Sequence, residues 1–291
     1  MVLIEKKRKM VKEHYKKELE FSGVVQKGDT GFDVQRIQEW LVLNTFTQPS
    51  FKCKCSVDRD FGPQTRKAVI EFQNFSKIEE DGVVGPQTWA KLVYPLSYAF
   101  DMKYLERWKE SKHHPGQKEF FTVRDAILAV SKRHLIAVPR ELGSNEGPWV
   151  RSYMGGHDGE AWAWCVGSTL TIIDQAMSLF GMKFTDYLPN TYSCDTLANS
   201  AIKKKTLIRN ADLKKMSLSE LNELIKPGDI MNVVKNSKDW THTALITKVH
   251  EDHFETWEGN TNDEGSREGF EVCTRKRNFH RQNIDVILLN L

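Results

Sequence analysis

The stretch THTALITKVHEDHFETWEGN, residues 241–260, predicts two β-strands joined by a short polar turn. Side chains alternate between the two faces of a strand. One face of the first strand therefore carries His242, Ala244 and Ile246, and one face of the second carries Thr256, Glu258 and Asn260. If the strands pair as a hairpin, Glu258 or Asn260 can reach the far ring nitrogen of His242. That contact would fix the tautomer of the histidine and support its charged form.

A single cysteine stands far upstream, at the predicted start of a helix in AWAWCVGSTLTIIDQAM (161–177). The apolar residues after Cys165 recur at helical spacing, at Val166, Leu170, Ile173 and Met177. The unpaired N–H groups and the dipole at a helix start favour a thiolate, which is the reactive form of cysteine. A lone cysteine at such a position is also a common buried hydrophobe, so Cys165 alone decides nothing.

The order Cys165, His242, Glu258, Asn260 is that of a nucleophile, a base and the groups that orient the base. Four other residues of similar chemistry have no such ordered partners. We interpret them as structural or surface residues: Tyr192, Cys194, Cys273 and His253.

These residues resemble the CHAP amidase/peptidase domains, relatives of the NlpC-like cysteine peptidases that cut bacterial cell walls. The resemblance rests on the Trp164–Cys165 pair and on the segments ELGSNEGPWVRSY (141–153), KPGDIMNV (226–233), THTALIT (241–247) and WEGN (257–260). It implies that Cys165 is the nucleophile, His242 the base, Glu258 the orienting acid and Asn260 an auxiliary group. It also implies a papain-like α+β fold with a central antiparallel sheet, and it requires no cofactor.

The segment GGHDGEAW (155–162) lies just before the nucleophile, in a region where some CHAP enzymes hold calcium. Calcium takes about six or more oxygen ligands, and only Asp158 and Glu160 are acidic here. We therefore expect no metal. We assign Asp158, with Trp164 and Trp257, to the groove that receives the substrate.

A repeat marks the front of the chain, where VDRDFGPQT (57–65) and EDGVVGPQT (80–88) align. Each copy places an aspartate before a tight Gly-Pro turn, and the proline then opens a helix. The pattern predicts three helices, over residues 28–43, 65–75 and 88–93.

Residues 28–92 resemble the peptidoglycan-binding domain type 1, with Arg59 in place of the usual glycine of the first loop. The resemblance implies a three-helix bundle that binds bacterial peptidoglycan through its two Gly-Pro loops, near Asp58, Arg59, Asp81 and Gln87. The alternative is a generic helical linker domain. We interpret Cys53 and Cys55, in an inserted stretch of the first loop, as part of a structural or redox-labile loop.

Composition fits a chain of two domains, with 291 residues of which 40% are hydrophobic. The excess of 42 basic over 39 acidic side chains gives a net charge of only +3, which is too little to indicate nucleic-acid binding.

No apolar run reaches the roughly 20 residues of a membrane span, so we expect no stable membrane insertion. The first twenty residues lack the apolar core of a secretory signal. Five cysteines without a framework spacing suit a reducing compartment.

The predicted fold class is α+β, with a small N-terminal three-helix bundle followed by a papain-like domain. We divide the chain into a basic segment (1–24), the peptidoglycan-binding bundle (25–94), a linker (95–116) and the CHAP-like domain (117–291). The basic segment is expected to be a solvated, lysine-rich helix, with contact to anionic wall polymers or lipid as the alternative. The linker is expected to hold a short helix at 101–111, and its His113 and His114 are interpreted as linker polarity.

The expected function is that of a monomeric peptidoglycan hydrolase that cuts a muramoyl–L-alanine amide or a stem-peptide bond; the sequence does not name which. With no signal segment expected, the hydrolase would be made in the host cytoplasm and reach the wall through a holin-type pore, as a phage endolysin. The alternatives are a secreted antibacterial effector with the same chemistry and a non-catalytic wall-binding protein.

Overall fold

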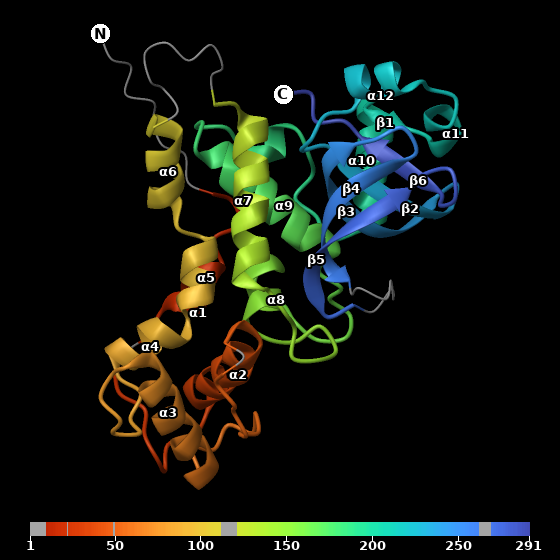
Figure 1. The fold of residues 1–291 in the computed structure, drawn as a ribbon. Coiled ribbons are helices and arrows are strands. Elements are labelled where there is room, and N and C mark those ends of the chain that lie inside the picture. Colours follow the sequence, from red (N-terminus) through yellow and green to blue (C-terminus); the bar gives the residue numbers. More distant parts are fainter. Residues whose placement is uncertain (1–9, 22, 49, 112–120, 262–268) are drawn as a thin grey trace.

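The computed structural model describes residues 10–21, 23–48, 50–111, 121–261 and 269–291, without the side chains of 108–111. A small helical unit forms one end of the molecule, long helices form the middle, and a β-sheet forms the side away from them (Figure 1). The predicted α+β class is confirmed. Among the described residues, no helix combines the length and the apolar character needed to cross a membrane.

The helical unit contains the three predicted helices, α2 (Phe32–Thr47), α3 (Pro63–Ser76) and α4 (Pro86–Leu92). Helices α3 and α4 both begin with a proline that follows a glycine, as the repeat predicts. The predicted apolar positions fill the core, including Ile37, Trp40 and Val69, none of which is exposed. A single antiparallel bridge between Val25 and Val84 joins the entry of the unit to its second loop.

The N-terminal segment packs against the rest of the protein, so the prediction of a solvated helix is wrong for the part described. Only α1 (Tyr15–Leu19) is helical, and Met10, Lys12, Tyr15 and Glu18 are buried. The backbone N–H groups of Val11 and Lys12 donate to the carboxylate of Asp174 at 2.8 and 2.7 Å. These long-range contacts fix the segment despite its lysines; residues 1–9 lie outside the described range.

The predicted linker region is also packed. It holds α5 (Tyr94–Ala99) and α6 (Met102–Ser111), and the second confirms the expected short helix. Four of its apolar side chains are buried: Leu96, Ala99, Phe100 and Leu105. His113 and His114 lie outside the described residues.

Three helices form the middle of the molecule: α7 (Val123–Ala137), α8 (Pro148–Tyr153) and α9 (Cys165–Ser178). Helix α7 begins with a capping box in which Thr122 and Asp125 exchange hydrogen bonds. Helix α9 starts at Cys165, as predicted, and all fourteen of its residues are buried. It runs between α7 and the sheet, which explains why it is apolar on all sides.

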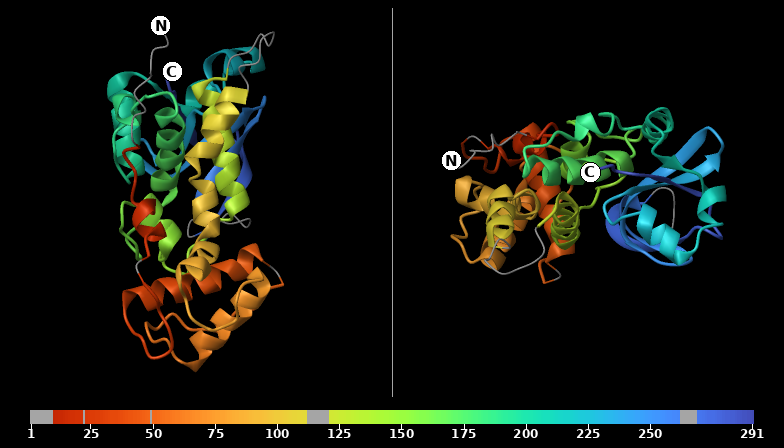
Figure 2. Two further views of the ribbon diagram at one scale, coloured as in Figure 1. Left: turned by 90° about the vertical axis from the view of Figure 1, so that its left-hand side faces the viewer. Right: turned by 90° about the horizontal axis from the view of Figure 1, so that it is seen from above.

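The sheet has six strands in the order β1-β6-β2-β3-β4-β5, with every neighbouring pair antiparallel, and is strongly curved (Figure 2). The strands are β1 (Leu207–Ile208), β2 (Ile230–Asn236), β3 (Asp239–Val249), β4 (His253–Thr261), β5 (Glu271–Asn278) and β6 (Ile284–Ile287). Short helices precede or connect them: η1 (Phe184–Asp186), α10 (Cys194–Lys204), α11 (Asn210–Leu213) and α12 (Leu218–Leu224). The predicted hairpin is β3–β4, with Leu245 opposite Trp257.

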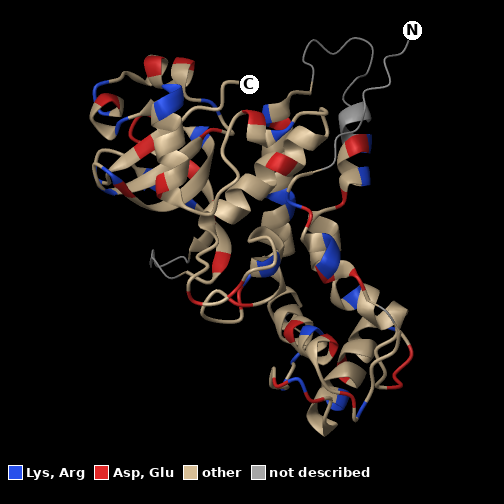
Figure 3. Cartoon of the chain, turned by 180° about the vertical axis from the view of Figure 1, so that it is seen from behind, with Lys and Arg blue, Asp and Glu red and all other residues tan. Residues whose placement is uncertain are grey.

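The sheet buries apolar side chains on two sides. Leu245 and Trp257 belong to the large core shared with the helices, whereas Ala244 and Ile246 belong to a second core closed by Leu221 of α12. Acidic and basic residues are interspersed over the helical and sheet parts in the view from behind (Figure 3).

A buried cluster of ion pairs joins the helical unit to the middle of the molecule. The Arg151 guanidinium on α8 contacts Glu18 of α1 at 2.8 Å and Glu39 of α2 at 2.6 Å. Its third contact is Asp158, at 3.0 Å. Because Arg151, Glu18 and Glu39 are all nearly inaccessible to water, loss of one partner would leave a buried charge uncompensated.

Candidate active site

Cys165 lies at the first turn of α9, where this helix meets the strand β3 that carries His242. The cysteine is 5% exposed, and its thiol hydrogen-bonds the imidazole of His242. The Nε2 atom of that ring contacts Glu258 Oε2 at 2.9 Å, so the nitrogen left for the cysteine is Nδ1. The three residues therefore form a continuous chain from thiol to imidazole to carboxylate.

Glu258 is fully buried and is held on its far side by Arg277 of β5. Arg277 donates through Nε to one carboxylate oxygen at 2.7 Å and through Nη2 to the other at 2.5 Å, a bidentate geometry. The Thr256 hydroxyl donates to Oε1 at 2.5 Å. Burial opposes the charge, but the hydrogen bonds from Arg277 and His242 hold the pKa of Glu258 well below its usual range.

The environment of His242 favours the imidazolium. Burial acts to lower its pKa, yet the hydrogen bonds to Cys165 and Glu258 outweigh burial and raise the pKa of His242 to about 9. An imidazolium at neutral pH is the form that stabilises a neighbouring thiolate.

A second thiol, Cys194 at the first turn of α10, lies 3.9 Å from Cys165, sulfur to sulfur. Its hydrogen bond, with those of His242 and the Thr243 backbone, lowers the pKa of Cys165 well below the usual thiol range, against burial. The same contact and burial raise the pKa of Cys194. The sequence predicts a structural or surface role for Cys194, and the structure places its thiol beside that of Cys165.

Asn260 does not reach the histidine. Its backbone is left-handed, with φ of 58°, and its Oδ1 accepts from the backbone N–H of Trp164 at 3.3 Å. Its Nδ2 donates to Asn145 at 3.2 Å. The pairing of β4 with β5 shifts register between Glu258 and Thr261, which breaks the alternation expected for the face of Asn260. Of the two residues left open by the sequence, Glu258 is thus the partner of His242, and Asn260 contacts Trp164, the residue before Cys165.

The three residues assigned to a substrate groove have other roles in this structure. Trp164 and Trp257 are 0% and 1% exposed, so neither side chain lines an open groove. Trp164 stacks on Tyr153 and donates through Nε1 to Glu141 at 2.9 Å. Asp158 accepts hydrogen bonds from the Arg151 guanidinium and from the backbone N–H of Gly147. Its carboxylate therefore belongs to the Arg151 ion-pair cluster.

Two half-exposed aromatic residues lie next to Cys165 and Cys194, where Trp164 and Trp257 are buried. Trp162 precedes Cys165 by three positions, and Tyr192 precedes Cys194 by two. Their rings meet edge to face with centroids 6.0 Å apart. Sequence analysis had assigned no function to either residue.

Arg277 was also missed by sequence analysis, since it lies in the alternating stretch EVCTRKRN with no motif of its own. It pairs opposite Phe254 on β4, and its long side chain extends past Thr256 to reach Glu258. Only the register of β5 against β4 reveals that contact.

The two Gly-Pro loops of the helical unit are built alike, each around a buried glutamine. Gln38 donates to Asp58 at 2.7 Å and to Thr65 at 3.0 Å. In the second loop, Gln73 donates to Asp81 at 2.8 Å and to Thr88 at 3.2 Å. The predicted loop aspartates therefore hold the loops in shape.

Backbone N–H groups also bond both aspartates: that of Asp60 holds the pKa of Asp58 below its usual value, and that of Val83 does so for Asp81. Arg59 occupies a left-handed position, with φ of 68°, equivalent to Gly82 with φ of 72°. Its Nε donates to Gln35 at 2.7 Å, which keeps the side chain along α2. Arg59 and Gln87 are exposed at these loops and remain available to a ligand.

In the inserted stretch of the first loop, the thiols of Cys53 and Cys55 lie 3.2 Å apart. The hydrogen bond between them lowers the pKa of Cys53 and raises that of Cys55. The pair is independent of Cys165.

Comparison with known proteins locates one recognisable unit. Residues 30–92 match the family described as "Putative peptidoglycan binding domain". The predicted peptidoglycan-binding character of this part of the chain is thereby supported.

Two relatives share short regions with the chain. One is the zinc D-Ala-D-Ala carboxypeptidase of Streptomyces albus G, 31% identical over 72 residues, which are 25% of this chain and 27% of the relative. The other is an uncharacterised protein of Kitasatospora aureofaciens, 54% identical over 41 residues, or 14% of this chain and 35% of the relative. The chain thus spans about a third or less of the relatives that it matches.

Among solved structures, the SleB N-terminal domain is 33% identical over 26% of this chain and 99% of that domain, with a TM-score of 0.23.

Proposed function

We propose that the protein is a peptidoglycan hydrolase that cleaves a wall amide bond with Cys165 as its nucleophile. The observation that carries this proposal is the continuous contact from Cys165 through His242 to Glu258, in a chain whose residues 30–92 match a peptidoglycan-binding family. The resemblance of the C-terminal part to CHAP domains, which implies a papain-like fold, supports the same assignment.

In the proposed mechanism, the Cys165 thiolate attacks the carbonyl carbon of the scissile amide. The backbone N–H of Cys165, at the start of α9, donates to the oxyanion that forms. His242 gives its proton to the leaving amine, and the C–N bond breaks to leave a thioester on Cys165. His242 then takes a proton from water, which attacks the thioester and releases the acid.

Glu258 and Arg277 act through His242 and do not touch the substrate in this mechanism. Glu258 holds the ring so that Nδ1 faces the thiol, and Arg277 holds Glu258 in its charged form. The half-exposed rings of Trp162 and Tyr192 are proposed to wall the groove in place of Trp164 and Trp257.

The peptidoglycan-binding unit would raise the local concentration of enzyme on an insoluble polymer without adding to the chemistry. We propose that a ligand meets it at the Gly-Pro loops, near Arg59 and Gln87. Release of a phage from its bacterial host is the biological setting that we propose. Holin or tail genes beside the coding sequence would favour this setting, whereas an adjacent immunity gene would favour a secreted effector.

The test is mass spectrometry of the fragments that the protein releases from purified sacculi. A new free amine on L-alanine identifies an amidase, and a new amine within the stem peptide identifies an endopeptidase. The matched variant is Cys165→Ala, for which we expect no release above background and unchanged binding to sacculi. Release by Cys165→Ala at the rate of the unmodified protein would refute the thiol mechanism.

A further inference from the structure

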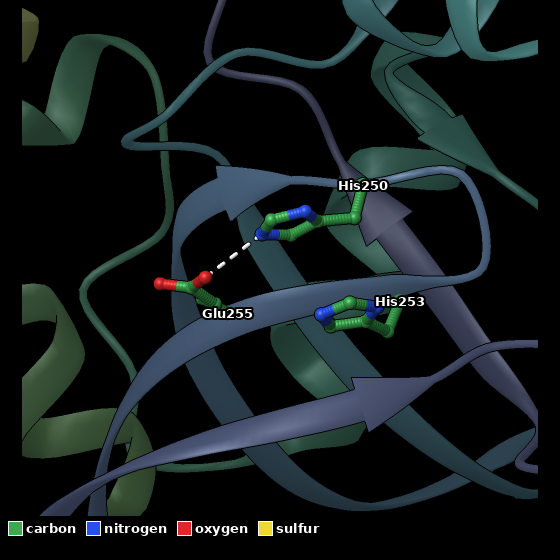
Figure 4. Close-up of side chains that lie close together, drawn as sticks. All are labelled: His250, His253 and Glu255. Carbon is green, nitrogen blue, oxygen red and sulfur yellow. Dashed lines mark hydrogen bonds and ion pairs between the residues drawn. The ribbon is translucent and has the colours of Figure 1, made fainter.

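A second group of metal-ligating side chains lies at the turn of the β3–β4 hairpin. His250 directly follows β3, and His253 and Glu255 lie at the start of β4. One ligand atom from each residue lies within 4.8 Å of the other two, and no other group of three within the described parts of the chain does so. Both imidazole rings turn an outer nitrogen toward the side where Glu255 lies (Figure 4).

The three side chains lie close together and must rotate to hold one ion. The two rings are parallel, with centroids 4.2 Å apart and planes at 4°, and His250 Nε2 contacts Glu255 Oε1 at 2.8 Å. Around Zn²⁺, bonds of about 2.0–2.2 Å place tetrahedral ligand atoms roughly 3.3–3.6 Å apart. Because the lone pairs of parallel rings do not converge, binding of one ion requires these partly exposed side chains to rotate.

His253 supplies an independent observation that points to a ligand. Its Nδ1 pairs with Asp252 Oδ1 at 2.7 Å, while its Nε2 is buried and has no hydrogen-bond partner. Asp252 is in turn held by Asn278, which donates to its other oxygen at 2.9 Å. A carboxylate on one ring nitrogen and an open lone pair on the other is the arrangement of a metal-binding histidine. A buried nitrogen without a partner is otherwise costly.

The charges around the site select among ions. Lys248 of β3 and Lys276 of β5 lie opposite Glu255 in the sheet and oppose a cation held only by charge. Two imidazoles favour zinc and its transition-metal neighbours, whereas calcium and magnesium favour sites made of oxygen ligands.

We propose that His250, His253 and Glu255 bind one divalent transition-metal ion, with Zn²⁺ as the best fit and water in the fourth position. The turn lies eight residues from His242 along β3, or about 26 Å at roughly 3.3 Å per residue. The ion is therefore remote from Cys165, and its effect is to lock the turn of the hairpin that carries His242 and Glu258. This proposal does not depend on the proposed hydrolase activity.

The test uses the full chain with Zn²⁺ as the probe. We expect one equivalent to bind, a higher melting temperature on binding, and a zinc X-ray absorption spectrum with nitrogen and oxygen neighbours only. The spectrum matters because the cysteines could also take zinc, and sulfur neighbours would reveal it. Activity is not used as a readout, since zinc at the Cys165 thiolate would inhibit a hydrolase.

Two ligand variants have matched controls. His253→Gln and Glu255→Gln should each lower the zinc affinity at least tenfold and abolish the thermal shift, while His280→Gln and Glu251→Gln, at exposed nearby positions, should leave both unchanged. Asp252→Asn should lower the affinity by about 10- to 100-fold, as expected for an outer partner of a ligand. Absence of binding, sulfur neighbours, or full affinity in both ligand variants would each overturn the proposal.

Discussion

The β3–β4 hairpin carries a histidine–glutamate pair at each end, and the two pairs differ in burial rather than in distance. The inner pair, His242 and Glu258, has a contact of 2.9 Å, and the turn pair, His250 and Glu255, has one of 2.8 Å. The side chains of the inner pair are 12% and 0% exposed, and those of the turn pair are 29% and 39% exposed.

The comparison indicates that the chemistry of a histidine–glutamate pair depends on the further residue that contacts it. The inner pair continues to a thiol on one side and to Arg277 on the other, so its charges are fixed in the interior. Water screens the turn pair, which continues to a histidine with an unused lone pair. One arrangement suits proton transfer, and the other suits a metal ion.

The largest expected effect is the difference in wall hydrolysis between variants of His242 and of His250. His242→Ala removes the proton donor and the charge beside the thiolate, so we expect wall hydrolysis to fall by roughly 10²- to 10⁴-fold. His250→Ala should leave the rate within about twofold, because the turn pair takes no part in the proposed chemistry. Initial rates on purified sacculi measure both. Equal losses in the two variants would break the comparison.

The next effect separates the two carboxylates. Glu258→Gln keeps the shape of the side chain but removes the charge that supports the imidazolium, so we expect a rate loss of about 10- to 1000-fold. It also leaves Arg277 without its buried partner, and we expect the free energy of unfolding to fall by about 3–5 kcal/mol. Activity and denaturant unfolding are measured together.

Glu255→Gln is the matched control for Glu258→Gln, since this carboxylate is exposed and its pair is screened. We expect a change in the free energy of unfolding of at most about 1 kcal/mol in the absence of metal. A large loss of stability from Glu255→Gln would mean that burial does not distinguish the two pairs.

The pH dependence should report the inner pair alone. The folded pKa of His242, about 9, lies above its usual value of 6.5, so its stabilising charge is fully present below about pH 6.5 and is lost as pH rises through about 9. The rate should therefore fall on the alkaline side near pH 9. In Glu258→Gln this limit should move down toward 6.5, and in Glu255→Gln it should stay in place. An alkaline limit that is unmoved in Glu258→Gln would contradict the proposed support of the imidazolium.

The smallest effect concerns Asn260, which the sequence could not separate from Glu258. Asn260→Gly keeps the left-handed backbone and removes the side-chain hydrogen bonds to Trp164, Asn145 and Gly269. We expect a loss of about 1–2 kcal/mol in the free energy of unfolding and no shift of the alkaline pH limit. A shifted limit would place Asn260 on the histidine after all.

Much of the fold was predictable because its signals are local. The Gly-Pro repeat fixes the starts of α3 and α4 within a few residues of chain, and helical spacing after Cys165 gives α9. Strand alternation on either side of a polar turn gives the β3–β4 hairpin and brings Glu258 within reach of His242. The sequence was therefore enough to predict that Glu258 or Asn260 is the partner of His242.

Contacts that depend on strand register and on packing between distant segments follow only from the tertiary structure. A shift in the pairing of β4 with β5 turns Asn260 away from His242, and the same pairing delivers Arg277 to Glu258. Packing of α10 brings Cys194 to Cys165, and Asp174 draws the lysine-rich N-terminal segment into the core. Sequence periodicity describes one element at a time, so it determined which residues could react, whereas the meeting of separate elements decided which partners surround them.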